Sequence, residues 1–191
     1  MSKHIAIISA AVGALALTAA TIASVSAQGK MKSEMSGEKT VMVGGAAMFP
    51  SRNIIQNAVN SKDHTTLVAA VKAAGLVSTL EGKGPFTVFA PTNSAFGKLP
   101  AGTVDNLVKP ENKPTLTRIL TYHVVPGRLE ASSLSDGKKL RTVEGEQLTI
   151  KRSGDKVMII DAKGDSATVT IPNVNQSNGV IHVVDTVLMP S

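Results

Sequence analysis

The chain reads TVFAPTNSAF from Thr87 to Phe96, and this stretch decides the fold. Its first half consists of β-branched, aromatic and small residues, which predicts a buried strand. Pro91 ends that strand, because proline cannot donate a hydrogen bond to a sheet. Thr92 or Asn93 then caps a helix that continues to Leu99, since either side chain can accept a free backbone N–H.

A second stretch, NGVIHVVD from Asn178 to Asp185, predicts a tight turn that leads into another strand. Most positions from Val180 to Leu188 are apolar. A run of this kind is typical of a central strand that is covered on both faces.

Helices are predicted in the first part of the chain and strands mainly in the last third. Asp63 is the expected N-cap of the clearest helix, and Gly75 is its expected left-handed stop. This order favours an α+β fold over alternating βαβ units. The expected helices cover residues 53–59, 65–74, 92–99, 103–108 and 114–120, and the expected strands cover 86–90, 122–125, 148–152, 157–160, 168–171 and 180–188.

Three motifs in this chain resemble the signatures of the fasciclin domain family. The stretch Thr87–Phe96 resembles the first box of the family, and Asn178–Asp185 resembles the second. Tyr122-His123 resembles the Tyr-His motif between the boxes, and the similarity extends from about Asn53 to Pro190.

The resemblance implies an α+β fold, a fasciclin-like β-wedge of two packed sheets with a helical layer from the N-terminal half. It also implies a secreted, non-enzymatic binding module that mediates cell-surface, matrix or host contact. In animal members, the Tyr-His segment and an Asp-Ile site before the second box are linked to integrin binding. Tyr122-His123 is present here, whereas Ile171–Val174 occupies the place of the Asp-Ile site.

The N-terminus predicts export. Lys3 precedes an apolar run, and Val25-Ser26-Ala27 offers the small residues of a signal-peptidase site. The alternative is a membrane anchor, but the run is shorter than the roughly 20 residues that a bilayer needs. We therefore expect a signal peptide over residues 1–27, a flexible tail over 28–50 and a fasciclin-like domain over 51–191. The protein would be secreted, either extracellular or periplasmic, as a monomer with no membrane span after signal removal.

Composition limits the partners. The chain has 0 Cys, so an exported form has no disulfides, and its formal net charge is +6. Positive charge favours acidic partners, namely polysaccharide, anionic lipid or nucleic acid. The expected partner is a cell-surface or matrix protein, or an acidic polysaccharide. With 3% aromatic residues there is little to stack on bases, which argues against nucleic acid. The candidate basic contacts are Lys139, Arg141, Lys151 and Arg152, and the alternative is that they are ordinary solvated charges.

Tyr122 and His123 are the other candidate ligand contacts. On a strand, the two rings would lie on opposite faces, so one could pack inward while the other meets solvent. The alternative is that they tie neighbouring loops together by hydrogen bonds. His182 is expected to be a hydrogen-bonded core residue, and His64 to be partly exposed near the start of a helix.

Nothing in the sequence predicts catalysis. Ser94 follows a strand and a turn, but Gly-x-Ser-x-Gly and other nucleophile motifs are absent from the sequence. We expect no catalytic residue, no metal and no cofactor. The alternative function is a periplasmic small-ligand or copper-binding protein that uses a histidine cleft or the methionines between Met31 and Met48.

Overall fold

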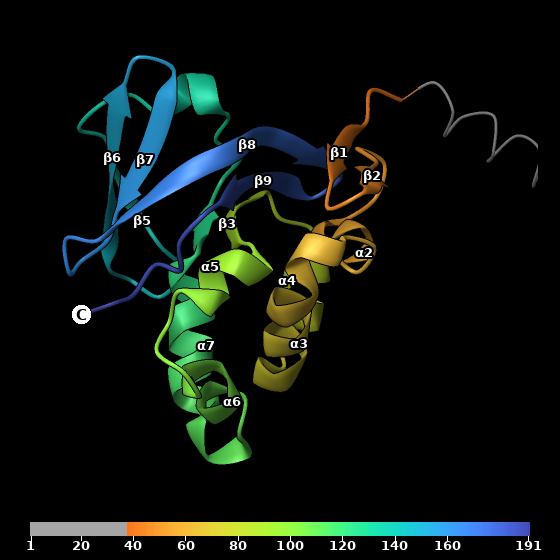
Figure 1. Cartoon of the computed structure of the whole chain (residues 1–191). Helices are drawn as coiled ribbons and strands as arrows, with labels where there is room; N and C mark the ends of the chain where they lie inside the picture. The colour runs from red at the N-terminus through yellow and green to blue at the C-terminus, as the bar shows by residue number, and fades with distance from the viewer. Residues whose placement is uncertain (1–37) are drawn as a thin grey trace, which may run out of the picture. The chain divides into compact units, whose positions relative to one another are not determined.

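A computed structural model describes residues 38–191 of the chain (Figure 1). The expected signal peptide and residues 28–37 of the expected tail lie outside this range. Across the described part of the chain, no helix has the length and apolar character needed to cross a membrane.

The folded region begins before the predicted boundary at residue 51. Strands β1 (Val41–Val43) and β2 (Ala46–Met48) form an antiparallel hairpin. Gly44 and Gly45 both have positive φ, as a two-residue hairpin turn of this type requires. Val43 and Met48 are each only 3% exposed and pack into the core. The predicted extent of the tail is therefore wrong, because two three-residue strands give too short a pattern to detect.

Seven strands form one continuous sheet in the order β4-β3-β9-β8-β7-β6-β5. The two signature stretches lie side by side as the second and third strands of this order, because β3 (Phe86–Pro91) pairs in parallel with β9 (Gly179–Val184). Every residue of β9 is buried, as expected for a central strand. The other strands are β4 (Val124–Pro126), β5 (Lys139–Arg141), β6 (Gln147–Ser153), β7 (Lys156–Ile160) and β8 (Ser166–Gln176).

The long strand β8 folds the sheet into a wedge. Its first residues pair with β7 and its later residues pair with β9. Within the second set the register with β9 shifts on both sides of Ile171, and Asn173 has a φ of 56°. Such irregularities bend a strand and increase its twist. The two halves of the sheet therefore enclose a core of their own, which includes Phe89, Tyr122, Leu134, Leu148, Ile150, Ile159 and Leu188.

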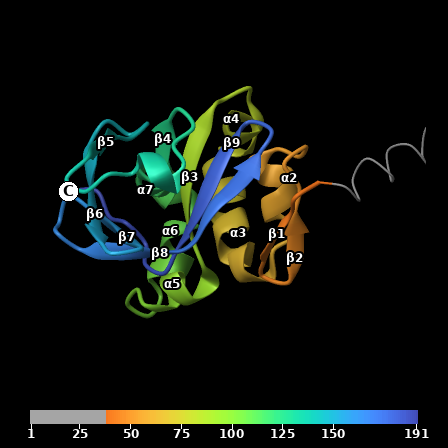
Figure 2. The same ribbon diagram turned by 90° about the horizontal axis from the view of Figure 1, so that it is seen from above.

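A layer of helices covers the other side of β3 and β9 (Figures 1 and 2). A second apolar core lies between them, and it includes Leu67, Val71, Val88, Leu120 and Ile181. This arrangement confirms the predicted α+β class, with its β-wedge and helical layer. The helices are α2 (Ile54–Ala58), α3 (Thr65–Ala74), α4 (Val77–Glu81), α5 (Asn93–Gly97), α6 (Thr103–Leu107) and α7 (Lys113–Tyr122).

The two ends of α3 show how local sequence sets the helix boundaries. At the C-terminus, Gly75 is left-handed and the Leu76 N–H donates to the Val71 carbonyl at 3.0 Å, which is the predicted Schellman stop. At the N-terminus the predicted cap by Asp63 is wrong. The Asn93 side chain at the start of α5 accepts the Thr66 N–H instead, at 3.0 Å. Asp63 lies in the preceding 3-10 turn, Lys62–His64, one residue before the N-cap position of α3, which His64 occupies.

Candidate functional site

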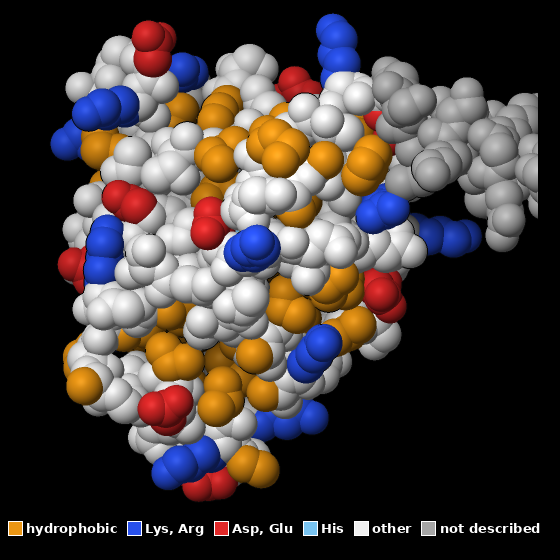
Figure 3. Space-filling view, turned by 45° about the vertical axis from the view of Figure 1, so that its right-hand side comes forward, with side chains coloured by type: hydrophobic (Ala, Val, Ile, Leu, Met, Phe, Trp, Pro, Cys, Tyr) orange, Lys and Arg blue, Asp and Glu red, His pale blue; other side chains and the backbone are white. Residues whose placement is uncertain are grey.

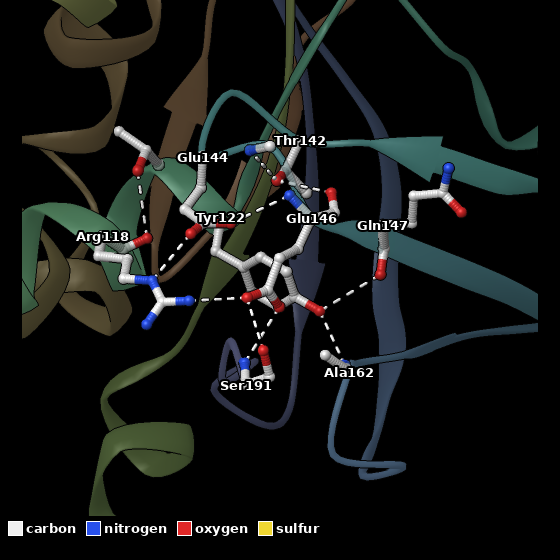
Figure 4. Close-up of polar contacts among 10 residues, drawn as sticks. Arg118, Tyr122, Thr142, Glu144, Glu146, Gln147, Ala162 and Ser191 are labelled. Carbon is white, nitrogen blue, oxygen red and sulfur yellow. Dashed lines mark hydrogen bonds and ion pairs between the residues drawn. The ribbon is translucent and has the colours of Figure 1, made fainter.

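Tyr122 is the last residue of α7 rather than part of a strand, and it is fully buried. Its hydroxyl oxygen accepts the Ala162 N–H at 2.8 Å, and the hydroxyl donates to the Gln147 carbonyl at 3.4 Å. Figure 4 shows these two bonds, which connect α7 to β6 and to the turn after β7. Burial raises the pKa of Tyr122 to about 12, so the phenol stays neutral at physiological pH.

His123 caps the C-terminus of α7 and is only 2% exposed. Its Nδ1 donates to the Ile119 carbonyl at 2.8 Å, and its Nε2 accepts the Leu188 N–H at 3.0 Å. Burial lowers the pKa of His123 to about 4, which keeps the ring neutral. The expectation that one ring of the Tyr-His pair faces solvent is wrong, because the pair ends a helix that packs against the sheet. Both rings hold elements together.

Charged side chains lie near Tyr122 (Figure 4). Arg118 forms ion pairs with Glu144 at 2.8 Å and with Glu146 at 2.7 Å. Glu146 also accepts hydrogen bonds from the Ser191 backbone N–H and hydroxyl, and these bonds together with Arg118 lower the pKa of its carboxyl group. The surface next to the Tyr-His motif is therefore an ion-paired network in which each carboxylate already has a partner.

The four predicted basic residues separate into two groups. Lys139 and Arg141 lie on one face of β5, and Lys151 lies on the same outward face of β6. All three are exposed. Arg152 lies on the opposite face of β6, where it is half-buried and its guanidinium reaches the Ala131 carbonyl at 3.5 Å. Lys151 and Arg152 are adjacent, and adjacent side chains of a strand point to opposite faces, so the four predicted residues do not form one surface.

Lys156 of β7 belongs with the outward group. It pairs with Ser153, which lies on the same face of β6 as Lys151, and it is exposed. We call Lys139, Arg141, Lys151 and Lys156 the basic face. Among the described residues, no ion pair involves any of the four. The outward side of the wedge therefore carries positive charge that the described residues do not neutralise.

His182 and His64 are both buried. His182 lies on β9, stacks on Phe89 and donates from Nε2 to the Leu129 carbonyl at 2.7 Å, which confirms its predicted role in the core. His64 was expected to be partly exposed but is only 4% exposed. The turn of the β1–β2 hairpin lies against the 3-10 turn that contains it, where the Lys62 N–H donates to the Gly44 carbonyl at 3.2 Å. Burial lowers the pKa of both rings.

The residues considered for catalysis or copper binding also include Ser94 and the tail methionines. Ser94 is exposed in the first turn of α5, where Thr92 provides the cap by accepting the Ala95 N–H at 3.2 Å. Of the tail methionines, Met42 is 60% exposed and Met48 is buried, whereas Met31 and Met35 lie outside the described residues. A metal at His123 or His182 would have to replace a backbone hydrogen bond at either ring nitrogen.

Two asparagines of the signature stretches have structural roles that the sequence did not reveal. Asn93 links α5 to the start of α3, as described above. Asn178 accepts the Ile54 N–H at 3.0 Å and donates to the carbonyls of Leu80 and Gly82 at 2.7 and 2.8 Å. Gly179 follows it because a Cβ there would collide with the Phe86 carbonyl oxygen. The Asn-Gly pair had indicated only a turn, but it also anchors α2 and α4 to the sheet.

Comparisons with known proteins agree with this fold. A sequence profile of the Fasciclin domain matches residues 62–190. Protein sll1483 of Synechocystis sp. is 49% identical over 153 residues, which cover 80% of this chain and 82% of the relative. The cell surface glycolipoprotein MPB83 of Mycobacterium bovis is 39% identical over 153 residues, which cover 78% of this chain and 64% of the relative.

A solved structure of a FAS1 domain pair from the insect cell adhesion molecule Fasciclin I has a TM-score of 0.66 to this chain. The two share 17% sequence identity, and the match covers 80% of this chain and 58% of the solved one. At that identity the likeness concerns the fold alone. The profile match and the similar relatives show that this chain belongs to the fasciclin family, a family of adhesion-type modules.

Proposed function

We propose that this protein is a secreted, non-enzymatic binding module that mediates cell-surface, matrix or host contact through the basic face. Membership of the fasciclin family supports an adhesion-type role. The mycobacterial relative that is named a cell surface glycolipoprotein supports a location outside the cytoplasm. Tyr122 supports the basic face from within, because its buried hydroxyl donates to the Gln147 carbonyl of β6.

One observation carries the choice of ligand. The basic face presents four exposed cations that no carboxylate of the described residues neutralises. Residues two apart on a strand lie about 7 Å apart on the same face, and neighbouring strands lie about 4.8 Å apart. Lys139 and Arg141 lie two residues apart on β5, and the cations of β5, β6 and β7 lie on adjacent strands. Such an array suits a repeating anion, so we propose an acidic polysaccharide as the ligand.

Chromatography on immobilised heparin tests this proposal. The variant Lys139→Glu/Arg141→Glu/Lys151→Glu reverses charge on the basic face. The control Lys62→Glu/Lys72→Glu/Lys83→Glu makes the same change in net charge at exposed positions on the helical side. We expect the first variant to elute at much lower salt than the control. Exposed charge pairs are screened over about 8–10 Å at physiological salt, so only cations close to the bound heparin contribute to retention.

Equal elution of the two variants would overturn the proposed ligand face, since net charge alone would then explain retention. Arg152→Ala adds a second check. Because Arg152 lies on the opposite face of β6, we expect this change to leave elution close to that of the wild type.

A further inference from the structure

The four cations of the basic face lie in one row. Residues that pair across antiparallel strands lie side by side on the same face of a sheet. Measured along β6, the strand register places the cations level with Gln147 (Arg141), Thr149 (Lys139), Lys151 itself and Ser153 (Lys156). These are four successive outward positions of β6, because the residues between them point to the other face. The row therefore runs obliquely across three strands, from β5 to β7.

The spacing of the row follows from strand geometry. Each step covers two residues along the strand direction, about 7 Å, and two of the three steps also cross to the next strand, about 4.8 Å away. Neighbouring Cα atoms in the row are therefore about 7–8 Å apart, and those of Arg141 and Lys156 are about 22 Å apart. A compact anion reaches one or two of these cations, whereas an extended chain of anions can reach all four.

Acidic side chains lie beyond both ends of the row. Asp155, which is exposed, directly precedes Lys156 in the turn between β6 and β7. The turn that follows Arg141 contains Glu144 and Glu146, which share one arginine in their ion pairs. A polyanion that continued past either end would meet negative charge, which repels it. The row of four cations therefore sets the length of chain that this surface can bind.

Uncharged polar side chains lie between the cations. Gln147, Thr149 and Ser153 share the outward side of β6 with Lys151, at half-buried or exposed positions. Their amide and hydroxyl groups can donate and accept hydrogen bonds, as sugar hydroxyls can. The strands β5, β6 and β7 contain no aromatic residue, so they offer no ring on which a nucleic-acid base could stack. Both observations favour a sugar chain over a nucleic acid.

We propose that an acidic polysaccharide binds in an extended conformation along this row, with its negative groups against the four cations in order from Arg141 to Lys156. The inference rests on the proposed function and adds the path and the length of the bound chain. Figure 3 shows the contrasting helical side of the molecule, where side chains of both charges are interspersed with apolar ones. A chain of repeating anions therefore fits the basic face better than that side.

Heparin oligosaccharides of increasing length test the proposal, with affinity measured from the backbone amide shifts of the protein. The tetrasaccharide can reach three consecutive cations, and the hexasaccharide is the shortest that can reach all four. We expect the hexasaccharide to bind roughly two- to fivefold more tightly than the tetrasaccharide, as expected for one added exposed ion pair. Equal affinity of the two, in a protein that binds polymeric heparin, would overturn the row and leave the proposed function intact. Failure to bind polymeric heparin would overturn both.

Single variants that remove the same charge distinguish the end of the row from its middle. In Lys156→Gln three consecutive cations remain, so the tetrasaccharide already reaches all of them and the advantage of the hexasaccharide should disappear. In Lys139→Gln the remaining cations still extend over the full length of the row, so the advantage should persist. An equal advantage in the two variants would show that the four cations do not act as a row.

A nitroxide at the reducing end of the hexasaccharide reports the direction of the bound chain in the wild-type protein. We expect it to broaden the backbone amides most strongly at one or both ends of the row, near Arg141 and Lys156. Strongest broadening at residues 166–168 of β8, which lie beside β7, would show that the chain crosses the row and would overturn the proposal. Oligothymidylate of matched length should compete weakly. If it displaced the labelled chain as well as unlabelled hexasaccharide does, the choice of a sugar ligand would be overturned.

Discussion

Tyr122 is the single tyrosine of the chain, so its ionisation can be followed without interference from another phenol. Burial raises its pKa from 10.0 to about 12. We expect the ultraviolet absorbance of tyrosinate to appear well above pH 10 in the folded protein and near pH 10 in concentrated urea. Since the folded pKa is the higher one, the stabilising effect is present below pH 10 and is lost as the pH rises towards 12.

The same titration in Arg118→Gln serves as a control. This change breaks the ion pairs above the ring but leaves the two hydrogen bonds of the hydroxyl in place. We expect Tyr122 to keep its raised pKa there, because desolvation is the main cause of the shift. Ordinary titration near pH 10 in the folded wild type would show that the ring is accessible to water and that a ligand could reach it.

At the level of single residues, sequence reasoning succeeded where one pattern determined the environment. His182 alternates with Val180 and Val184, so its inward direction could be predicted. His64 could not be placed correctly, because its burial depends on a hairpin far too short to predict. Tyr122 and His123 precede two valines, and this local pattern resembles a strand although the structure ends a helix there.

Helix α3 provides a test at the level of one element. Asn93 accepts the Thr66 N–H and donates to the Lys62 carbonyl at 2.8 Å, so it caps a helix that lies almost thirty residues earlier in the chain. We expect Asn93→Ala to lower the free energy of unfolding by about 1–2 kcal/mol, the usual loss for a removed N-cap. Urea unfolding of the variant and the wild type measures this difference in free energy.

Ser94→Ala is the matched control for that change. Ser94 is exposed beside Asn93 and forms no side-chain hydrogen bond within the described range. We expect Ser94→Ala to change the free energy of unfolding by no more than about 0.5 kcal/mol. If both variants lost the same stability, the effect would come from helix α5 itself and not from the cap on α3.

Elements with a strong local pattern could be predicted, and the short ones could not. The strands β3, β6, β7 and β9 and the helices α3 and α7 carry several apolar residues at a clear period, and they appear where expected. The three-residue strands β1, β2 and β5 and the five-residue helix α4 were missed. Their residues adopt regular structure because neighbouring elements hold them there, which a local pattern does not encode.

At the scale of the whole molecule, the pairing of β3 with β9 is a long-range property. The sequence predicted both strands, but their parallel contact joins residues more than ninety positions apart. The basic face depends in the same way on three strands being placed side by side, so only its residue types could be predicted.

The three histidines of the folded region make the stability of the whole molecule depend on pH. Burial lowers the pKa of His64, His123 and His182, and for His123 it lowers the value from 6.5 to about 4. Between these two values the unfolded chain binds protons that the folded protein does not. Stability therefore falls as the pH falls through this range.

Urea unfolding between pH 7 and pH 4 measures this dependence, and His123→Gln isolates the contribution of the His123 ring. A glutamine amide can still donate to the Ile119 carbonyl and accept the Leu188 N–H, but it does not titrate. We expect the wild type to lose about 3 kcal/mol more than this variant over the range, since one pKa unit corresponds to about 1.4 kcal/mol. The control Ile119→Val perturbs the same helix without removing a titrating group, so its pH dependence should follow the wild type. If His123→Gln shows the same pH dependence as Ile119→Val, then His123 takes up its proton in the folded state and the ring is not enclosed as the structure has it.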